Sequence, residues 1–404
     1  SLPKYQQHLS KVDPIRVNGK VTQVIGLTVE SHGPNCKIGD VCELYPAHDT
    51  KPLLAEVVGF REHRVLLMPL GDLGAIGPGC DVVNTGKPLT IRVGQALLGR
   101  VLDGLGQPLD GLPLPTNLKK HSTFNVPVNP LSRPRIEQPL SIGVKAIDGL
   151  LTVGKGQRIG IFAGSGVGKS TLLGMVARNT SADINVIALI GERGREVMEF
   201  LEHDLGAEGM ARSIVIVATS DQPALIRIKG AMIATSIAEY FRDCGLDVML
   251  MMDSVTRYAM AEREVGLAIG EPPTTRGYTP SVFANLPKLL ERSGQTTRGS
   301  ITAFYTVLVD ADDMNEPIAD AVRGILDGHI ILDRALAQKG HYPAIDTLNS
   351  VSRVMDQIIP PDHQQAALNV KRLLSTYREA EDLINIGAYK PGSNASIDMA
   401  LKHI

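Results

Sequence analysis

The sequence has almost no excess charge, because 41 lysine and arginine residues face 43 aspartate and glutamate residues, giving a formal net charge of −2. Such a chain lacks the basic surface of a bulk nucleic-acid binder, although a local basic loop is compatible with this balance. The four cysteines show no C-x-x-C spacing and no histidine at metal-ligand spacing. We therefore expect reduced, idle thiols rather than a disulfide framework or a structural metal site.

Long hydrophobic runs are also missing. No apolar stretch approaches the roughly 20 residues that a membrane-spanning helix needs, and residues 1–5 lack the apolar core of a signal peptide. We therefore expect a soluble cytoplasmic protein. Position 1 is serine rather than methionine, so we also expect the natural chain to begin upstream.

The length of 404 residues, with 43% hydrophobic and 21% charged residues, is typical of two or three globular domains. Over residues 1–85, short strand-like runs at 21–29, 53–58 and 64–68 alternate with glycine and proline, which predicts a small β-barrel. Prolines then cluster over 113–139 and predict an irregular, mostly extended connection.

The central part of the sequence has the pattern of a parallel sheet covered by helices on both faces. Continuous apolar runs, mostly separated by helix-like stretches, occur at 159–163, 186–190, 214–218, 248–252 and 301–308. Runs of this kind are typical of strands buried on both sides.

Beyond about residue 346 no further strands are predicted. After Pro360-Pro361-Asp362, apolar residues recur at alternating spacings of four and three, which predicts one amphipathic helix; they are Ala366, Val370, Leu373, Tyr377, Ala380 and Ile384. The expected domains are thus 1–85, 86–345 and 346–404.

A phosphate-binding loop is predicted where residues 163–170 read A-G-S-G-V-G-K-S, between the run 159–163 and a helix. Glycines let backbone N–H groups surround phosphates, lysine adds a positive charge, and serine can ligate Mg²⁺. The first position of the usual motif is glycine, and Ala163 replaces it here with another small residue. We expect the loop and the start of the helix to contact nucleotide through Gly164, Ser165, Gly166, Val167, Gly168, Lys169, Ser170 and Thr171.

Two carboxylates at strand ends are candidates for the rest of the site. Asp253 ends the run 248–252, where it would hold Mg²⁺ or, alternatively, only cap a helix. Glu192 follows the run 186–190 and is placed to orient an attacking water. For Glu192 the alternatives are the nearby Glu196 and a merely solvated charged loop.

Together these blocks resemble the rotary and export ATPase superfamily, which includes the catalytic subunits of F- and V-type ATPases and the ATPases of type III protein export. The segment 98–111 is similar to the entry to their nucleotide domain, and 343–352 matches the superfamily signature. The segments 151–158, 191–196 and 300–308 resemble the export branch. Flagellar export ATPases are most similar, and those of virulence-type injection systems are the alternative.

The resemblance implies a RecA-like P-loop core between an N-terminal β-barrel and a C-terminal helical domain. It implies ATP and Mg²⁺ as ligands, with Lys169 and Ser170 in the P-loop roles and Asp253 as the Mg²⁺ carboxylate. It makes Glu192 the water-orienting group. The remaining implied site residues are Arg193 near the γ-phosphate, Arg257 facing the phosphates, Tyr342 packing on adenine, and Arg353 as an arginine finger supplied across a subunit boundary.

The resemblance further implies a homohexameric ring that hydrolyses ATP in the cytoplasm, peripherally bound at the inner face of the cell membrane. The expected partners are a stator or regulator, stalk-like proteins, export-gate membrane proteins and chaperone–substrate complexes, and no nucleic acid. The chain stops within a helical pattern that includes Ile397 and Ile404, and we expect further residues there and at the N-terminus. Without them we expect the chain to be largely monomeric at micromolar concentration.

Three other functions compete with this interpretation. In proton-coupled synthases the catalytic glutamate and the finger lie in different chains, whereas here Glu192 and Arg353 share one chain, which favours a homomer. An RNA-translocating ring helicase would need aromatic stacking surfaces, but residues 1–85 contain only Tyr5, Tyr45 and Phe60. A non-catalytic scaffold would not need the full set of charged residues.

Overall fold

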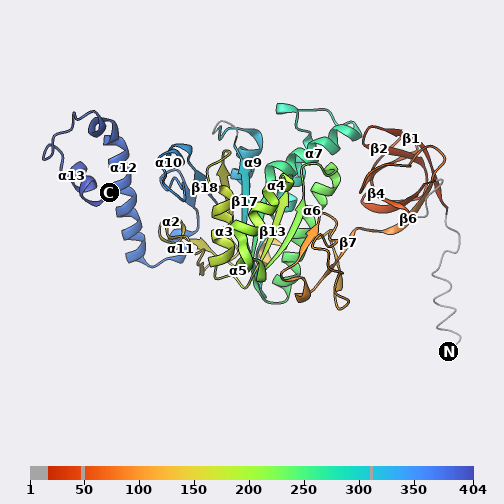
Figure 1. Cartoon of the computed structure of the whole chain (residues 1–404), viewed down its shortest axis with the longest axis horizontal. Coiled ribbons are helices and arrows are strands. Elements are labelled where there is room, and N and C mark those ends of the chain that lie inside the picture. The colour runs from red at the N-terminus through yellow and green to blue at the C-terminus, as the bar shows by residue number, and fades with distance from the viewer. Residues whose placement is uncertain (1–16, 47–50, 310–312) are drawn as a thin grey trace.

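The protein consists of a small barrel, a central α/β domain and a set of C-terminal helices, which follow one another along its long axis (Figure 1). The computed structural model describes residues 17–46, 51–309 and 313–404. Within these residues, no helix is both long and apolar enough to cross a bilayer. The expected fold class is confirmed.

The N-terminal barrel is closed in the strand order β1-β2-β5-β4-β3-β6. Its strands are β1 (Gly19–Ile25), β2 (Thr28–His32), β3 (Asp40–Tyr45), β4 (Leu53–Arg61), β5 (Arg64–Pro69) and β6 (Asp81–Pro88). The run 21–29, read as one strand from the sequence, is divided into a hairpin, since Gly26 adopts a φ of +56° at which the chain turns. Alternate residues such as Val29, Leu44 and Leu67 fill the interior.

The central sheet follows the order β19-β18-β12-β17-β15-β13-β14-β8, with β16 paired to β17. Every pair from β18 to β8 is parallel, while β19 and β16 add antiparallel pairs. The strands are β8 (Val101–Asp103), β12 (Arg158–Ala163), β13 (Ile184–Ile190), β14 (Ser213–Ala218), β15 (Asp247–Asp253), β16 (Gly294–Gln295), β17 (Ser300–Leu308), β18 (Gly328–Leu332) and β19 (Val351–Ser352).

All five apolar runs are strands, but the sheet contains four further strands that the sequence did not predict: β8, β16, β18 and β19. In β18 the side chains are alternately buried and half-buried rather than continuously buried. The expectation of no strand beyond residue 346 is wrong, because β19 pairs with β18 at the edge of the sheet. A two-residue strand is too short to produce a periodic pattern.

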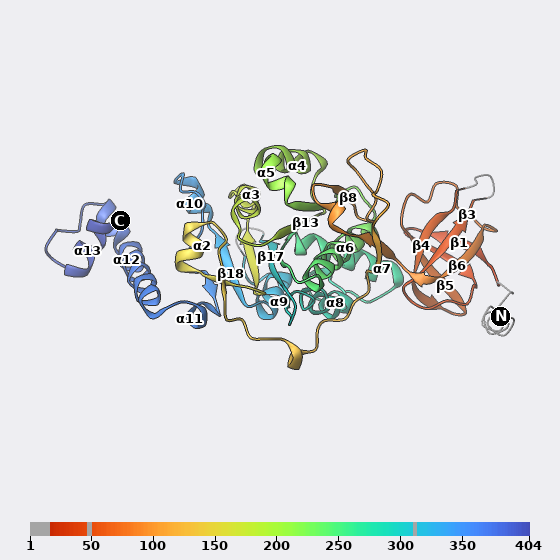
Figure 2. The same ribbon diagram turned by 90° about the horizontal axis from the view of Figure 1, so that it is seen from below.

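Helices cover both faces of the central sheet (Figure 2). One face is covered by α6 (Ala224–Asp243), α7 (Val255–Ile269), α8 (Pro280–Leu290) and α9 (Pro317–Ile325). The other is covered by α2 (Lys145–Leu150), α3 (Lys169–Asn179), α4 (Gly194–Glu199), the π-helical turn η3 (Phe200–Leu205) and α5 (Gly206–Ala211).

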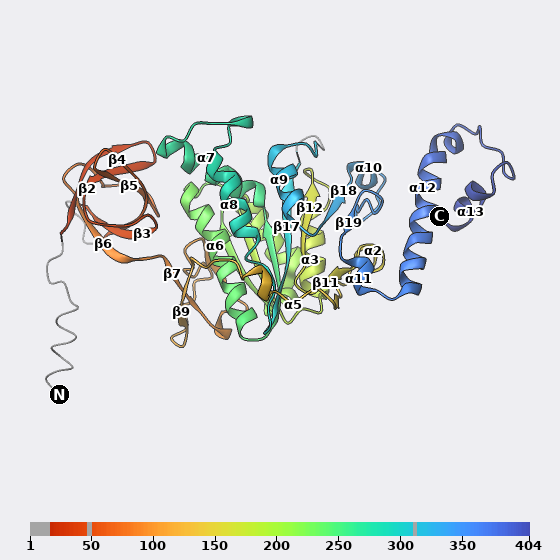
Figure 3. The ribbon, with the colours of Figure 1, turned by 180° about the vertical axis from the view of Figure 1, so that it is seen from behind.

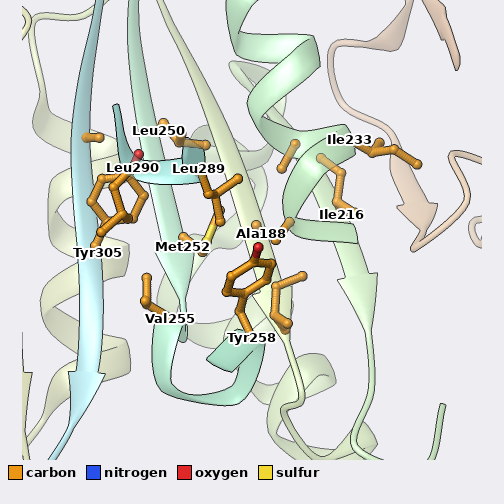
Figure 4. Close-up of a cluster of buried hydrophobic side chains, with 14 of the residues drawn as sticks. Ala188, Ile216, Ile233, Leu250, Met252, Val255, Tyr258, Leu289, Leu290 and Tyr305 are labelled. Carbon is orange, nitrogen blue, oxygen red and sulfur yellow. The ribbon is translucent and has the colours of Figure 1, made fainter. Parts of the chain in front are cut away.

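The two faces alternate along each strand. In β15, Leu250 and Met252 point to the α7–α8 face, where they meet Tyr258 and Leu289 (Figure 4), while Met251 belongs to the cluster under α3. Each such side chain contributes roughly 1.5–3 kcal/mol as an upper estimate. This double-sided burial holds the carboxyl ends of β12, β13 and β15 in fixed positions, and the predicted phosphate loop, Glu192 and Asp253 lie at those ends.

Shorter elements connect these parts. The strand β7 (Thr90–Val93) pairs with β9 (Lys119–Ser122), and β10 (Pro139–Leu140) pairs with β11 (Val153–Gly154). The proline-rich connection is therefore mostly irregular, as expected, but it is tied down by two short ladders. Single helical turns complete the list: η1 (Gln95–Leu97), η2 (Pro130–Ser132), η4 (Thr275–Gly277), α10 (Arg334–Gln338) and α11 (Met355–Ile358).

At the C-terminus, α12 (Pro361–Asn385) stands beside the central domain and packs against α13 (Ala395–His403) (Figure 3). The predicted helix is confirmed, but its expected apolar face is only partly covered. Ala380 is buried, whereas Ala366 and Val370 are exposed. Its polar contacts with the central domain include an ion pair between Arg378 and Asp346.

Candidate active site

The predicted phosphate loop lies between the carboxyl end of β12 and the first turn of α3. Gly166 and Gly168 have φ values of +74° and +85°, in the left-handed region that favours glycine. A Cβ on Gly168 would lie 3.3 Å from the Tyr342 ring, so a larger residue would be crowded there as well. Val167 is buried and anchors the loop, while Ser165 and Gly166 face solvent.

Three of the predicted charged residues meet directly after this loop. Lys169 Nζ lies 2.5 Å from Asp253 Oδ1 and 3.4 Å from Glu192 Oε1. Burial alone would lower the pKa of Lys169, but the charges of Asp253 and Glu192 outweigh it and raise that pKa. Three strands that are far apart in the sequence therefore bring together one cation and two carboxyl groups, with the cation held between them.

Glu192 is held at the site by the turn that ends β13. Gly191 has a φ of +74°, and a Cβ there would lie 2.7 Å from Arg257 Cβ, so both the turn and the close approach require glycine. Burial and the neighbouring Asp253 raise the pKa of Glu192 to about 7, against the lowering effect of Lys169. Perturbed carboxyl groups of this kind cluster at functional sites.

The competing Glu196 lies beside Glu192 and contributes to its raised pKa, but its ion pair is with Arg193 rather than with Lys169. It pairs with Arg193 at 3.2 Å on the exposed start of α4, and the Arg193 side chain is 79% exposed. Glu192 therefore contacts the phosphate-loop lysine, whereas Glu196 does not. The expected position of Arg193 near a γ-phosphate stays a prediction.

Arg257 carries a donor without an acceptor. Among the residues that the structure describes, its buried Nε has no hydrogen-bond partner, and its Nη1 reaches the Met260 sulfur at 3.8 Å. A buried guanidinium N–H left without an acceptor is costly. Since Arg257 packs against Gly191 beside Glu192, this donor fits an anionic group bound at the same strand ends.

Thr306 is a site residue that the sequence analysis did not identify. Its hydroxyl lies 2.7 Å from Asp253 Oδ1 and 3.2 Å from the Met252 carbonyl oxygen, and the side chain is fully buried. Thr306 reaches Asp253 because β17 lies between β12 and β15. The only signal in the sequence is a threonine near the carboxyl end of the run 301–308, which also contains Thr302.

Tyr342 and Arg353, the two predicted site residues near the end of the central domain, lie in different parts of it. Tyr342 is 60% exposed and lies against the phosphate loop at Gly168. Arg353 follows β19, and its backbone N–H donates to the Asp327 carbonyl oxygen at 3.0 Å, near the amino end of β12. A six-residue strand spans roughly 17 Å, so Arg353 does not join the Lys169 cluster of its own chain.

The arrangement can bind a nucleoside triphosphate. Backbone N–H groups, Lys169 and the unpaired Arg257 donor supply the positive environment that phosphates need. The Asp253 carboxylate and the Ser170 hydroxyl, in the first turn of α3, are hard oxygen ligands of the kind that Mg²⁺ prefers. These residues therefore fit Mg²⁺ together with a phosphate chain.

Family models match most of the chain. The ATP synthase alpha/beta family nucleotide-binding domain matches residues 143–352, and the beta-barrel domain of the same family matches 21–86. The C-terminal domain of the type III secretion ATPase EscN matches residues 359–404.

Curated relatives and solved structures agree with these matches. The chain is 62% identical over 395 residues to a flagellum-specific ATP synthase of Bacillus subtilis, covering 98% of this chain and 90% of the relative. It is 54% identical over 391 residues to a type 3 secretion system ATPase of Xanthomonas euvesicatoria, covering 96% and 87%. The structure of assembled EscN from enteropathogenic E. coli superposes with a TM-score of 0.88 at 50% identity, covering 95% of this chain and 92% of that one.

Proposed function

The chain belongs to the ATP synthase alpha/beta family, and from this premise we propose that it is a Mg²⁺-dependent ATPase that works as a homohexameric ring and energises flagellar protein export. The observation that carries the enzymatic part is the meeting of Lys169, Glu192 and Asp253 at adjoining strand ends. Similarity favours the flagellar system, because the Bacillus relative is 62% identical and the Xanthomonas type 3 secretion ATPase is 54% identical. The virulence-type system remains the second candidate.

The first role of these residues is to bind the phosphates. Before ATP arrives, Lys169 is paired with Asp253 at 2.5 Å. The β- and γ-phosphates offer Lys169 a competing anion, and the N–H groups of the phosphate loop bind the same oxygens. Asp253 and Ser170 are then free to hold Mg²⁺, which neutralises charge on the phosphates.

The second role is to direct water at the γ-phosphate. Glu192 orients the attacking water and accepts its proton, for which a carboxyl group with a raised pKa is well matched. Arg257 donates a hydrogen bond from its Nε–H to a phosphate oxygen. The Arg193 side chain moves from Glu196 toward the γ-phosphate. Tyr342 packs on the adenine ring beside Gly168.

The third role requires a second copy of the chain. Arg353 is exposed at the sheet edge, and in the described part of its own chain its side chain makes one long hydrogen bond, with Nη2 lying 3.3 Å from the Arg323 carbonyl oxygen. We assign it to the phosphate site of the neighbouring copy, where a guanidinium would stabilise the transition state. Each site of the ring would then use Lys169 from one copy and Arg353 from the next.

The partners that we propose for this chain are inferred from its relatives. Solved structures show EscN as an assembled ATPase and in complex with its central stalk EscO. By this likeness, this chain assembles with copies of itself around a stalk-like protein. The further partners that we propose are a stator or regulator, the export gate and chaperone–substrate complexes. The proposed location is the inner face of the cell membrane.

The function is tested by replacement in a flagellated bacterium. In a Bacillus subtilis strain lacking its flagellum-specific ATPase, a chimera of this chain with the relative's own terminal segments should restore filament secretion and swimming. The same chimera with Lys169→Ala should not. A chimera that hydrolyses ATP in vitro but restores no secretion, although it is present at the normal level, would overturn the flagellar assignment and leave the ATPase assignment intact.

The role of Thr306 can be tested separately. Thr306→Val should lower turnover about 10- to 100-fold and raise the Mg²⁺ concentration needed for half-maximal rate, because Asp253 loses the hydroxyl that orients it. Thr306→Ser keeps the hydroxyl and is the matched control. A Mg²⁺ titration of ATP hydrolysis measures both effects, and an unchanged Mg²⁺ dependence in Thr306→Val would show that the contact is only structural.

A further inference from the structure

The chain that leads to Arg353 is held by a buried side chain at the amino end of the central sheet. β19 ends at Ser352, directly before Arg353, and pairs with β18, which lies beside β12 (Figure 3). Gln157 directly precedes β12 and is fully buried. Burying an amide is costly unless its donors and acceptor find partners, so the partners of Gln157 indicate its role.

The oxygen of the Gln157 amide is bound by the turn before β12. The Gly154 backbone N–H donates to Gln157 Oε1 at 2.8 Å. Because a backbone N–H can only donate, this contact fixes which end of the amide is the oxygen. The amide NH2 group, with its two N–H donors, therefore points toward the other side of the turn.

The NH2 group reaches the two groups that flank the Arg353 backbone. Gln157 Nε2 lies 3.1 Å from the Asp327 carbonyl oxygen and 3.1 Å from Ser352 Oγ. The same Asp327 carbonyl accepts from the Arg353 backbone N–H at 3.0 Å. The Ser352 hydroxyl donates its proton to the Thr152 carbonyl at 2.8 Å, which leaves its oxygen to accept from Gln157.

Asp327 is itself fixed to β12. Its carboxylate accepts from the Arg158 backbone N–H at 3.1 Å and from Arg158 Nε and Nη2 at 3.0 and 3.1 Å. Its backbone N–H donates to the Arg158 carbonyl at 2.9 Å. The backbone of Arg353 is thus tied to a rigid part of the sheet, whereas its side chain is exposed. Functional groups need supporting residues that hold them within roughly 0.5 Å of the productive geometry.

Gln157 lies far from the phosphate loop of its own chain. β12 has six residues and spans roughly 17 Å. Gln157 precedes the first of these residues, and the loop follows the last. Within the described residues, the side-chain hydrogen bonds of Gln157 go to Gly154, Asp327 and Ser352, and none of these three is assigned to ATP binding.

We propose that Gln157 is a positioning residue for Arg353. It fixes the backbone at Ser352 and Arg353 so that the Arg353 guanidinium reaches the phosphate site of the neighbouring copy. This inference rests on the role proposed above for Arg353. It assigns Gln157 to the active site of the next copy, although β12 leads to the phosphate loop of its own chain.

The variant Gln157→Met tests this role, because methionine is about as long as glutamine but has no amide. Misplacing a group that acts in the transition state costs up to about 10²-fold, so we expect kcat to fall about 10- to 100-fold. The affinity for ATP, measured by fluorescent-nucleotide titration, should not change. An unchanged kcat, or a loss of ATP affinity in the folded variant, would overturn the inference.

A matched control removes another buried amide of the same sheet. Asn185 of β13 is fully buried and donates to the Ala177 carbonyl at 2.8 Å and to Ser213 Oγ at 3.2 Å. Asn185→Leu should lower the melting temperature but leave kcat of the folded protein nearly unchanged. A fall in kcat equal to that of Gln157→Met would show that any buried amide of the sheet has this effect, which contradicts a specific role for Gln157.

Mixing variants shows in which half of the shared site Gln157 acts. Combined with Lys169→Ala chains, which supply a correctly held finger, Gln157→Met chains should show turnover well above the mean of the two variants alone. Combined with Arg353→Ala chains they should not exceed that mean, because neither chain then supplies a correctly placed finger. The opposite pattern would place Gln157 with the phosphate loop of its own chain, and recovery in neither mixture would indicate a general structural defect.

The mixture of Arg353→Ala with Lys169→Ala chains is the reference. If it recovers turnover and the mixture of Gln157→Met with Lys169→Ala does not, the inference about Gln157 fails while the shared site stands. If mixed rings form and the reference itself recovers nothing, the proposed role of Arg353 is wrong and this inference falls with it. Ser352→Ala replaces Gln157→Met if that variant does not fold. It removes one of the two contacts from the other side, and the same pattern of recovery is expected; turnover equal to that of the parent would then count against the inference.

Discussion

Replacing Lys169 by alanine is expected to reduce Mg-ATP hydrolysis by at least about 100-fold and to weaken nucleotide binding as well. Lys169 is the cation held between Asp253 and Glu192, and it is the group that would face the β- and γ-phosphates. Removing one preorganised donor from a transition state costs on the order of 10²–10³ in rate. Phosphate release and fluorescent-nucleotide titration measure the two losses.

Three further variants make this result specific. Lys119→Ala removes an exposed lysine of β9 and should change neither quantity. Glu192→Gln should lower turnover by about 10²–10⁴ but retain ATP affinity, because it removes the proton acceptor and keeps the shape. Glu196→Gln should keep most of the turnover, since Glu196 pairs with Arg193 whereas Glu192 is the one that pairs with Lys169. If Glu196→Gln is the inactive variant of the two, the water-orienting residue has been misassigned.

Arg353→Ala is expected to reduce turnover by about 10³–10⁵, the range found for arginine fingers. Within the described residues, the Arg353 side chain makes an exposed hydrogen bond to the Arg323 carbonyl, and losing such a surface contact, worth about 1 kcal/mol or less, could not explain this loss. Arg353→Lys should recover little, because lysine lacks the planar fork. Light scattering with ATP present separates a catalytic loss from an assembly defect.

The activity of the parent chain should also depend on its concentration. If every site needs Arg353 from a neighbouring copy, specific activity should rise as copies associate and reach a plateau once rings are complete. The rate per chain is measured across dilution at saturating Mg-ATP. A rate per chain that is constant down to concentrations where light scattering finds only monomer would contradict a shared site.

The phosphate loop could be predicted because the residues that bind phosphate are contiguous in the sequence. Residues 163–170 contain the turn glycines, the lysine and the serine in one stretch, and the strand before it is a continuous apolar run. Asp253 and Glu192 were also predictable, since each directly follows such a run. Parallel strands place their carboxyl ends at one edge, which brings these residues together.

The contact of Thr306 with Asp253 could not be predicted from the sequence, and for Arg257 the resemblance implied only that it faces the phosphates. Thr306 contacts Asp253 because β17 lies between β12 and β15, an order that does not follow the order of the strands in the sequence. The unpaired Nε of Arg257 depends on how its side chain packs against Gly191. The ion pair between Glu56 and Lys229 joins two domains, and no local pattern marks it.

Mixing two inactive variants tests the shared active site most directly. Arg353→Ala chains keep an intact phosphate loop, and Lys169→Ala chains keep an intact finger, so mixed rings contain interfaces that pair the two intact halves. We predict that turnover, measured as phosphate release, rises well above that of either variant alone when the two are combined. Mixed rings that demonstrably form but recover no turnover, or Arg353→Ala chains that hydrolyse ATP at the normal rate by themselves, would contradict the account.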